Sequence, residues 1–148
     1  MPTPFESAQL NLKLFDLRRE PALREARAWF VREFNPESFA ELATLVRGKR
    51  NASFRMVISY WNMAASLVTT GAIEADAFYA AHDEIFATFS KIYLHLAELR
   101  TASGEPEFCK DMEAVVLAAP NARIILERRR KTIRDAAIHA AQAAQEDF

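Results

Sequence analysis

The stretch from residue 54 to residue 71 constrains this chain most, because its spacing predicts a helix that is apolar on nearly every side. One apolar stripe has the spacing 3-4-3-4 and consists of Phe54, Val57, Trp61, Ala64 and Val68. A second stripe beside it consists of Met56, Tyr60, Met63 and Leu67. A helix with so much apolar surface is normally covered by other helices, and Gly71 can end it. The pattern therefore predicts a buried central helix over residues 54–70.

The next stretch, residues 75–100, predicts a long partner for that helix. Side chains that are apolar, apart from one histidine, recur at alternating steps of four and three residues: Phe78, His82, Ile85, Phe89, Ile92, Leu96 and Leu99. The connection between the two stretches is too short for anything but an antiparallel arrangement. We therefore expect an antiparallel helical hairpin, 54–70 with 75–100, at the centre of the fold.

Start and stop signals divide the rest of the chain into further helices. Residues 5–17 predict a first helix with apolar side chains on two sides. No strand signal finds a partner strand, so the expected fold class is all-α, a bundle of six or seven helices. The last helix turns alanine-rich from about residue 136, and its end either packs against a neighbour or frays. The further start signals are, in order, Pro21, Asn35 with Pro36, Asn51 or Ser53, Pro106, and Asn121.

The length, the net charge and the number of cysteines set limits on the class of protein. The length of 148 residues indicates a single domain, 1–148, that can bury a sizeable core. The formal net charge of −1 favours neither nucleic acid nor an acidic membrane as a partner. The one cysteine excludes an intrachain disulfide, and no segment reads as a secretory leader or a membrane span. We expect a soluble, cytoplasmic protein without a membrane partner.

Several short strings combine uncommon residues at fixed offsets. They are LFDLRRE at 14–20, REARAWF at 24–30, FRMVISYW at 54–61, ASLV at 65–68 with Gly71, ELR at 98–100 and GEP at 104–106. Together they resemble small all-helical bacterial proteins that are grouped as a domain of unknown function. The resemblance extends over roughly residues 10–120. It implies an all-helical fold and a bacterial source, and it implies no activity.

No arrangement of residues that carries chemistry is recognisable. The chain lacks the Glu-x-x-His pairs of di-iron bundles, the Cys and His spacings of zinc sites and the glycine-rich loops that hold phosphates. We therefore predict no catalytic residue, no metal site and no cofactor, and the sequence favours a protein that is not an enzyme. His82 falls on the apolar seam of its helix, so we interpret it as a hydrogen-bonded core histidine.

A narrow polar stripe on the central helix has two interpretations. It consists of small polar residues and one arginine, flanked by two aromatics: Arg55, Ser59, Asn62 and Ser66, with Tyr60 and Trp61. The first interpretation is structural, with Asn62 partly buried and hydrogen-bonded to a neighbouring helix. The second is that these residues line a pocket for a small molecule. The sequence favours the first and leaves the second open.

Two basic clusters offer a further candidate surface. One lies in the loop before the central helix and the other in the last helix: Arg47, Lys49 and Arg50, and Arg128, Arg129 and Arg130. If both faced one way they would form an anion-binding or phosphate-binding surface. The alternative is a solvated face, because consecutive residues spread around a helix.

Three functions follow from these observations. The leading prediction is a non-catalytic protein-interaction or regulatory module. Self-association as a homodimer is suggested by the apolar surplus on the first helix and by the aromatic residues that flank the 78–99 seam. The alternative is a small-molecule sensor that uses the polar stripe. An anion or nucleic-acid binder that uses the basic clusters is third.

Overall fold

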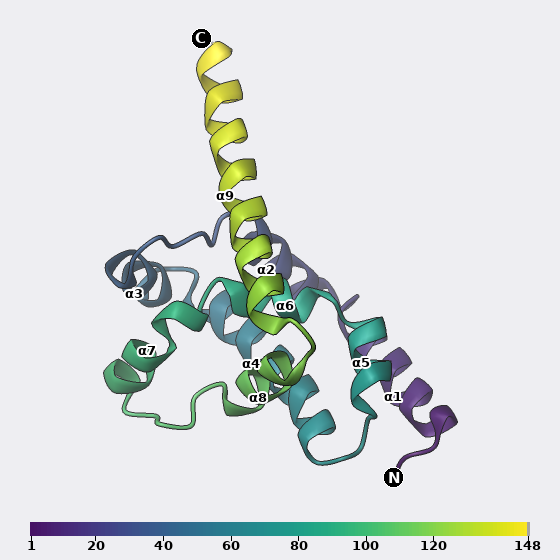
Figure 1. The fold of residues 1–148 in the computed structure, drawn as a ribbon. Coiled ribbons are helices and arrows are strands. Elements are labelled where there is room, and N and C mark those ends of the chain that lie inside the picture. The colour runs from purple at the N-terminus through teal and green to yellow at the C-terminus, as the bar shows by residue number, and fades with distance from the viewer. Residues whose placement is uncertain (148) are drawn as a thin grey trace.

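The computed structural model describes residues 1–147, and over this range the chain is helical without a strand (Figure 1). The all-α prediction is therefore confirmed. The elements are α1 (Pro4–Leu17), α2 (Pro21–Arg32), α3 (Phe39–Arg47), α4 (Asn51–Thr69), α5 (Ala75–Ala81), α6 (Glu84–Ser90), a 3₁₀ turn η1 (Tyr93–His95), α7 (Leu96–Ser103), α8 (Lys110–Ala118) and α9 (Ala122–Glu146).

Helix α4 is the buried central helix that the sequence predicts. Trp61, Ala64 and Ala65 are completely buried, and α4 packs mainly against α2 and α8. The helix ends where Gly71 takes a left-handed backbone with φ of 82°, a conformation that costs a residue with a Cβ atom about 1–2 kcal/mol. Gly71 therefore ends α4 as the sequence predicts.

The predicted long helix over residues 75–100 is wrong, because the chain breaks there into α5, α6, η1 and α7. The first break falls at His82, whose backbone leaves the helical region with φ of −131° and ψ of 57°. The buried His82 side chain forms a hydrogen bond across 3.1 Å to Asn11 on α1. Helix α5 accordingly packs on α1 rather than on α4, so the expected central hairpin is also wrong.

The apolar seam itself survives these breaks. All its members are buried, although they are spread over three helices, α5, α6 and α7, and the connections between them: Phe78, His82, Ile85, Phe89, Ile92, Leu96 and Leu99. The 4-3 spacing shows which side chains face the core. A break between two helices does not change this spacing when the side chains on both sides of the break still face the core.

The expected helix count and three of the expected starts also need correction. Residues 1–147 hold nine α-helices rather than six or seven, because the seam is divided. Ser38 caps α3 through a bond from the Glu41 N–H, so Asn35 and Pro36 precede the helix. Helix α4 follows Arg50 without a side-chain cap, and α8 begins at Lys110 rather than at Pro106. Pro21 and Asn121 stand where the sequence predicts, although the Asn121 side chain makes no capping bond.

Two polar connections hold the outer helices to the core. Glu84, in the first turn of α6, accepts hydrogen bonds from Arg27 across 2.8 and 3.0 Å and from Arg18 across 3.2 Å. The buried Lys91 ammonium donates to the carbonyls of Phe30 and Val31 at the end of α2, where unpaired carbonyl groups favour a cation. Burial lowers the pKa of Lys91 to about 8.

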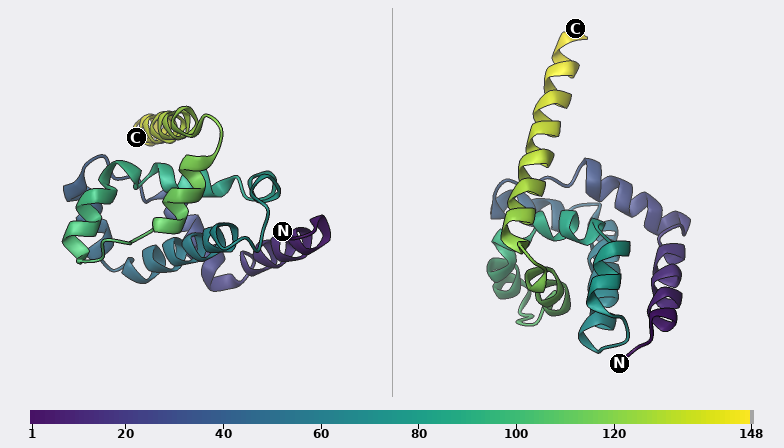
Figure 2. Two further views of the ribbon diagram at one scale, coloured as in Figure 1. Left: turned by 60° about the horizontal axis from the view of Figure 1, so that its bottom comes forward. Right: turned by 45° about the vertical axis from the view of Figure 1, so that its right-hand side comes forward.

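Helix α9 leaves the body of the molecule. Its root, residues 122–133, lies against α6 and α8. Beyond the root the helix stands out alone, as Figure 1 and the right-hand view of Figure 2 show. Every residue from 134 to 147 is exposed. The alanine-rich end therefore remains helical to Glu146 without packing against another part of the described chain.

Candidate functional site

A groove runs between α4 and the irregular segment that links α7 to α8. Its volume is about 410 Å³, which falls in the range of about 300–1,000 Å³ that is typical of small-molecule sites. It is lined by Phe54, Arg55, Ile58, Ser59, Asn62, Glu105, Glu107, Phe108 and Cys109.

The floor of the groove is apolar. Phe54, Ile58 and Cys109 are buried, and Phe108 is half-buried. Cys109 adopts a left-handed backbone with φ of 58°, which is uncommon for a residue other than glycine. Burial raises the pKa of the Cys109 thiol to about 12, so the sulfur stays protonated near neutral pH.

Asn62 holds one wall of the groove in place. Its side-chain oxygen accepts a hydrogen bond from the backbone N–H of Met112 in the first turn of α8. Cys109, at the N-cap position of α8, offers no side-chain bond of its own. The Asn62 NH₂ group makes no hydrogen bond within residues 1–147, so it is free to donate to a ligand.

The polar rim of the groove carries charges of both signs. Neither Arg55 nor Glu105 forms an ion pair with any described residue, and both are exposed. Glu107 is already paired with Lys110 across 2.9 Å. One free guanidinium and one free carboxylate therefore flank an apolar floor.

Three of the six residues predicted for a ligand site line this groove, and three do not. Arg55, Ser59 and Asn62 line it. Tyr60 instead points into the core, where its hydroxyl donates to the Leu14 carbonyl and burial raises its pKa to about 12. Trp61 is completely buried. Ser66 donates to the Met63 carbonyl of its own helix across 2.6 Å.

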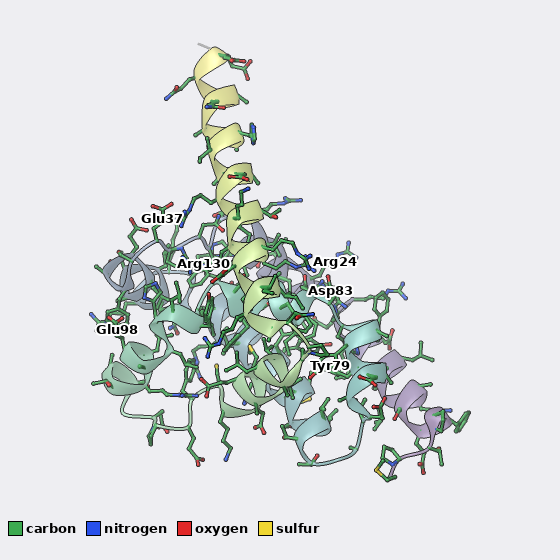
Figure 3. The ribbon with its side chains drawn as sticks, viewed as in Figure 1. Arg24, Glu37, Tyr79, Asp83, Glu98 and Arg130 are labelled. Carbon is green, nitrogen blue, oxygen red and sulfur yellow. The ribbon has the colours of Figure 1, made fainter. Side chains whose placement is uncertain are left out.

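The two basic clusters are held by different elements. Arg50 donates to Glu25 of α2 across 2.7 Å and lies over the Trp29 ring. Arg129 pairs with Asp83, which Figure 3 labels at the start of α6. Each cluster therefore already has a carboxylate partner. Three residues of these clusters are exposed without an ion pair among the described residues: Arg47, Lys49 and Arg128.

Arg130, the last residue of the second cluster, lies over the Tyr93 ring with 5.9 Å between its guanidinium carbon and the ring centroid. Figure 3 shows it at the root of α9.

Sequence reasoning missed the wall of the groove that residues 105–109 form. Because a helix was expected to start at Pro106, this segment was expected to be helical. The chain instead forms successive turns up to Lys110. The αL residue Gly104, with φ of 72°, was the one local signal, because it ends α7 and releases the chain into the turn segment.

The described residues offer no cluster of three His, Cys, Asp or Glu side chains that could hold a metal ion. Among residues 1–147, no helix combines the length and the apolar character that crossing a bilayer requires.

Comparison with known proteins gives a match to a protein family. A family model described as "Domain of unknown function (DUF4760)" matches residues 4–118, from the start of α1 to the end of α8. Neither the curated proteins nor the solved structures contain a match.

Proposed function

The chain belongs to the DUF4760 family, and from the groove between α4 and residues 105–109 we propose that it is a binding module for a small zwitterionic molecule, such as an amino acid with an apolar side chain. The sequence alone ranks protein interaction ahead of ligand binding. The groove supports the reverse order, because it has the volume, the apolar floor and the polar groups that a small-molecule site requires.

The observation that carries this proposal is the pair of unpartnered charges on the rim. The guanidinium of Arg55 suits a carboxylate, which it can bind through two parallel hydrogen bonds. The carboxylate of Glu105 suits an ammonium group. Phe54, Ile58 and Phe108 supply an apolar surface for the rest of the ligand.

The lining supports binding without catalysis. Among the described residues that form the groove there is no histidine to act as a general base. The thiol of Cys109, whose pKa burial raises to about 12, is protonated and therefore a poor nucleophile. We accordingly propose a sensor or carrier rather than an enzyme.

Thermal shift with matched ligands tests the proposal. We expect free amino acids with apolar side chains to raise the melting temperature. Their methyl esters, which lack the carboxylate, and their N-acetyl derivatives, which lack the ammonium group, should have a much smaller effect. Binding constants for the active compounds would then be measured by calorimetry.

Variants locate the binding to the groove. Arg55→Gln and Glu105→Gln should each weaken binding by about tenfold or more, because each removes a charge-assisted contact. Arg123→Gln removes an equivalent exposed positive charge at the root of α9 and should leave the affinity unchanged. The proposal fails if no compound shifts the wild-type melting temperature, or if both rim variants bind as the wild type does.

A further inference from the structure

A small hollow lies where the root of α9 meets the loop between α2 and α3. Its volume is about 90 Å³, which is space for about three water molecules at roughly 30 Å³ each. It is lined by residues 35–37 of the loop, by Ser90 and Lys91 at the end of α6, and by one side of α9 between residues 130 and 137. We call it the α9 hollow. It shares no residue with the groove beside α4, so the two sites are separate.

Lys91 brings a buried positive charge to the α9 hollow. The residue is 7 % exposed, and its ammonium group carries three N–H donors. Two of them donate to the carbonyls of Phe30 and Val31, and the third has no partner among residues 1–147. No carboxylate of that range forms an ion pair with it. A buried charge is costly unless an opposite charge compensates it, and two carbonyl dipoles do so only in part.

Two guanidinium groups stand about one turn apart on the side of α9 that faces the hollow. Arg130 and Arg134 both line it, and neither forms an ion pair with any described residue. Arg130 lies over the Tyr93 ring with 5.9 Å between the guanidinium carbon and the ring centroid. This contact uses the flat face of the guanidinium and leaves the N–H groups at its edge free to donate.

The α9 hollow therefore gathers three cations and one carboxylate. The carboxylate belongs to Glu37, which Figure 3 labels, like Arg130, near the root of α9. Glu37 is exposed and forms no ion pair within residues 1–147. Positive charge is thus in excess here, in contrast to Arg50 and Arg129 of the two basic clusters, which already have carboxylate partners.

We infer that the α9 hollow binds phosphate, either as the free ion or as the phosphoryl group of a monoester. A phosphate dianion offers an oxygen to each of the three cations, whereas a carboxylate has two oxygens and a single charge. Arginine binds phosphate oxygens through two parallel N–H···O bonds, and a lysine ammonium adds a compact positive charge. Arg130 and Arg134 would hold the anion from α9, with Lys91 beneath it.

The size of the hollow limits what enters it. A volume of about 90 Å³ has room for one tetrahedral oxyanion but not for a nucleoside or a sugar ring. Its rim is open, because Glu37, Arg134 and Ala137 are exposed. The rest of a phosphate monoester would therefore project into solvent.

Glu37 gives the inference a test of sign. Its carboxylate repels a bound anion from the rim of the hollow, so Glu37→Gln should bind phosphate severalfold more tightly than the wild type. A site for an amine or a metal cation would lose affinity on the same substitution.

Isothermal titration calorimetry with sodium phosphate tests the inference on the full chain, at constant ionic strength and without other polyvalent anions. The wild type should bind phosphate saturably. Arg130→Gln and Arg134→Gln should each weaken binding by about tenfold or more, because each removes charge-assisted hydrogen bonds. Arg128→Gln removes an exposed positive charge from another side of α9 and should leave the affinity unchanged. Lys91 is not substituted, because its ammonium also holds the end of α2.

Two further probes identify the ligand. Acetate should bind about tenfold more weakly than phosphate or less, because it has one charge and two oxygens. Glycerol 3-phosphate separates the two sources of the phosphoryl group. Binding as tight as that of phosphate assigns the site to a phosphorylated solute, and much weaker binding assigns it to the free ion.

The inference is overturned if phosphate does not saturate the wild type or if Arg128→Gln weakens binding as much as Arg130→Gln does. It is also overturned if acetate binds as tightly as phosphate, or if Glu37→Gln weakens phosphate binding. Arg55→Gln, in the groove beside α4, should leave the phosphate affinity unchanged. This inference and the proposed function can therefore fail independently.

Discussion

The side-chain oxygen of Asn62 accepts a hydrogen bond from the backbone N–H of Met112 across 3.0 Å. The first N–H groups of a helix have no partner within it, and the residue in the N-cap position of α8 does not supply one. Asn62, on the neighbouring helix α4, therefore caps the N-terminus of α8. This geometry agrees with the structural interpretation of Asn62 that the sequence favours, and the same residue also lines the groove.

Asn62→Leu should destabilise the protein. The substitution leaves the Met112 N–H without its acceptor, and an unpaired, partly buried amide costs about 1–3 kcal/mol. The free energy of unfolding would be measured by urea denaturation. Ser66→Ala is the matched control, because the Ser66 hydroxyl bonds only within its own helix, and it should change stability by less than about 0.5 kcal/mol. Equal effects of the two substitutions would contradict this account.

Stability should fall in acid because of His82. Burial, aided by the positive charge of Arg18, lowers its pKa to about 4 from an ordinary value of 6.5. Its Nε2 donates to Asn11, whereas the buried Nδ1 has no partner among the described residues, so a proton there would be poorly solvated. Between pH 6.5 and 4 the unfolded chain binds this proton more readily than the folded chain.

The stability linked to His82 is therefore fully present above about pH 6.5 and is lost as the pH falls to about 4, by about 3 kcal/mol in all. The measurement is the unfolding free energy at a series of pH values. His82→Gln cannot titrate, so its curve should lie lower at pH 7 and be flatter below pH 6.5. Two parallel curves would rule out His82 as the source.

Glu84→Gln should cost about 2 kcal/mol of stability. Glu84 accepts hydrogen bonds from both Arg18 and Arg27 in a mostly buried position, and removing its charge leaves two guanidinium groups poorly compensated. Glu107→Gln breaks the exposed pair with Lys110 and should cost clearly less than Glu84→Gln, because solvent screens that pair. Denaturation of both variants in the same buffer gives the comparison, and a smaller loss for Glu84→Gln would refute the assignment.

The thiol of Cys109 should react slowly in the folded protein. It is 3 % exposed, and burial raises its pKa to about 12. At pH 8, alkylation by iodoacetamide should be much slower than that of a free thiol and should reach the normal rate in denaturant. Mass spectrometry at timed intervals gives both rates. Rapid labelling of the native protein would show that the floor of the groove opens.

The sequence predicted elements where a local signal decides the structure. The Pro21 start, the Gly71 stop and the buried α4 depend on backbone freedom and on apolar spacing, both of which are local. The break at His82 could not be found in this way. It depends on a hydrogen bond to Asn11, a residue 71 positions earlier that only the folded chain brings near.

The candidate site was half predicted for the same reason. Arg55, Ser59 and Asn62 share one face of a helix, so their spacing in sequence was enough to group them. Tyr60 and Trp61 were included as neighbours in sequence, but they project toward the core. The opposite wall, residues 105–109, comes to α4 only through the packing of α8, which no local pattern encodes.

Helices α8 and α9 are each preceded by a non-glycine residue with the same left-handed backbone, Cys109 and Asn121, both with φ of 58°. Helix α8 has nine residues and is about 14 Å long, with the groove at its N-terminal end and the start of α9 at its C-terminal end. The free arm of α9, beyond residue 133, is longer than α8. Leu126 of α9 is buried in the same core as Met112 and Val116 of α8, so the packing that places the wall of the groove also sets the direction in which the free arm of α9 leaves the body.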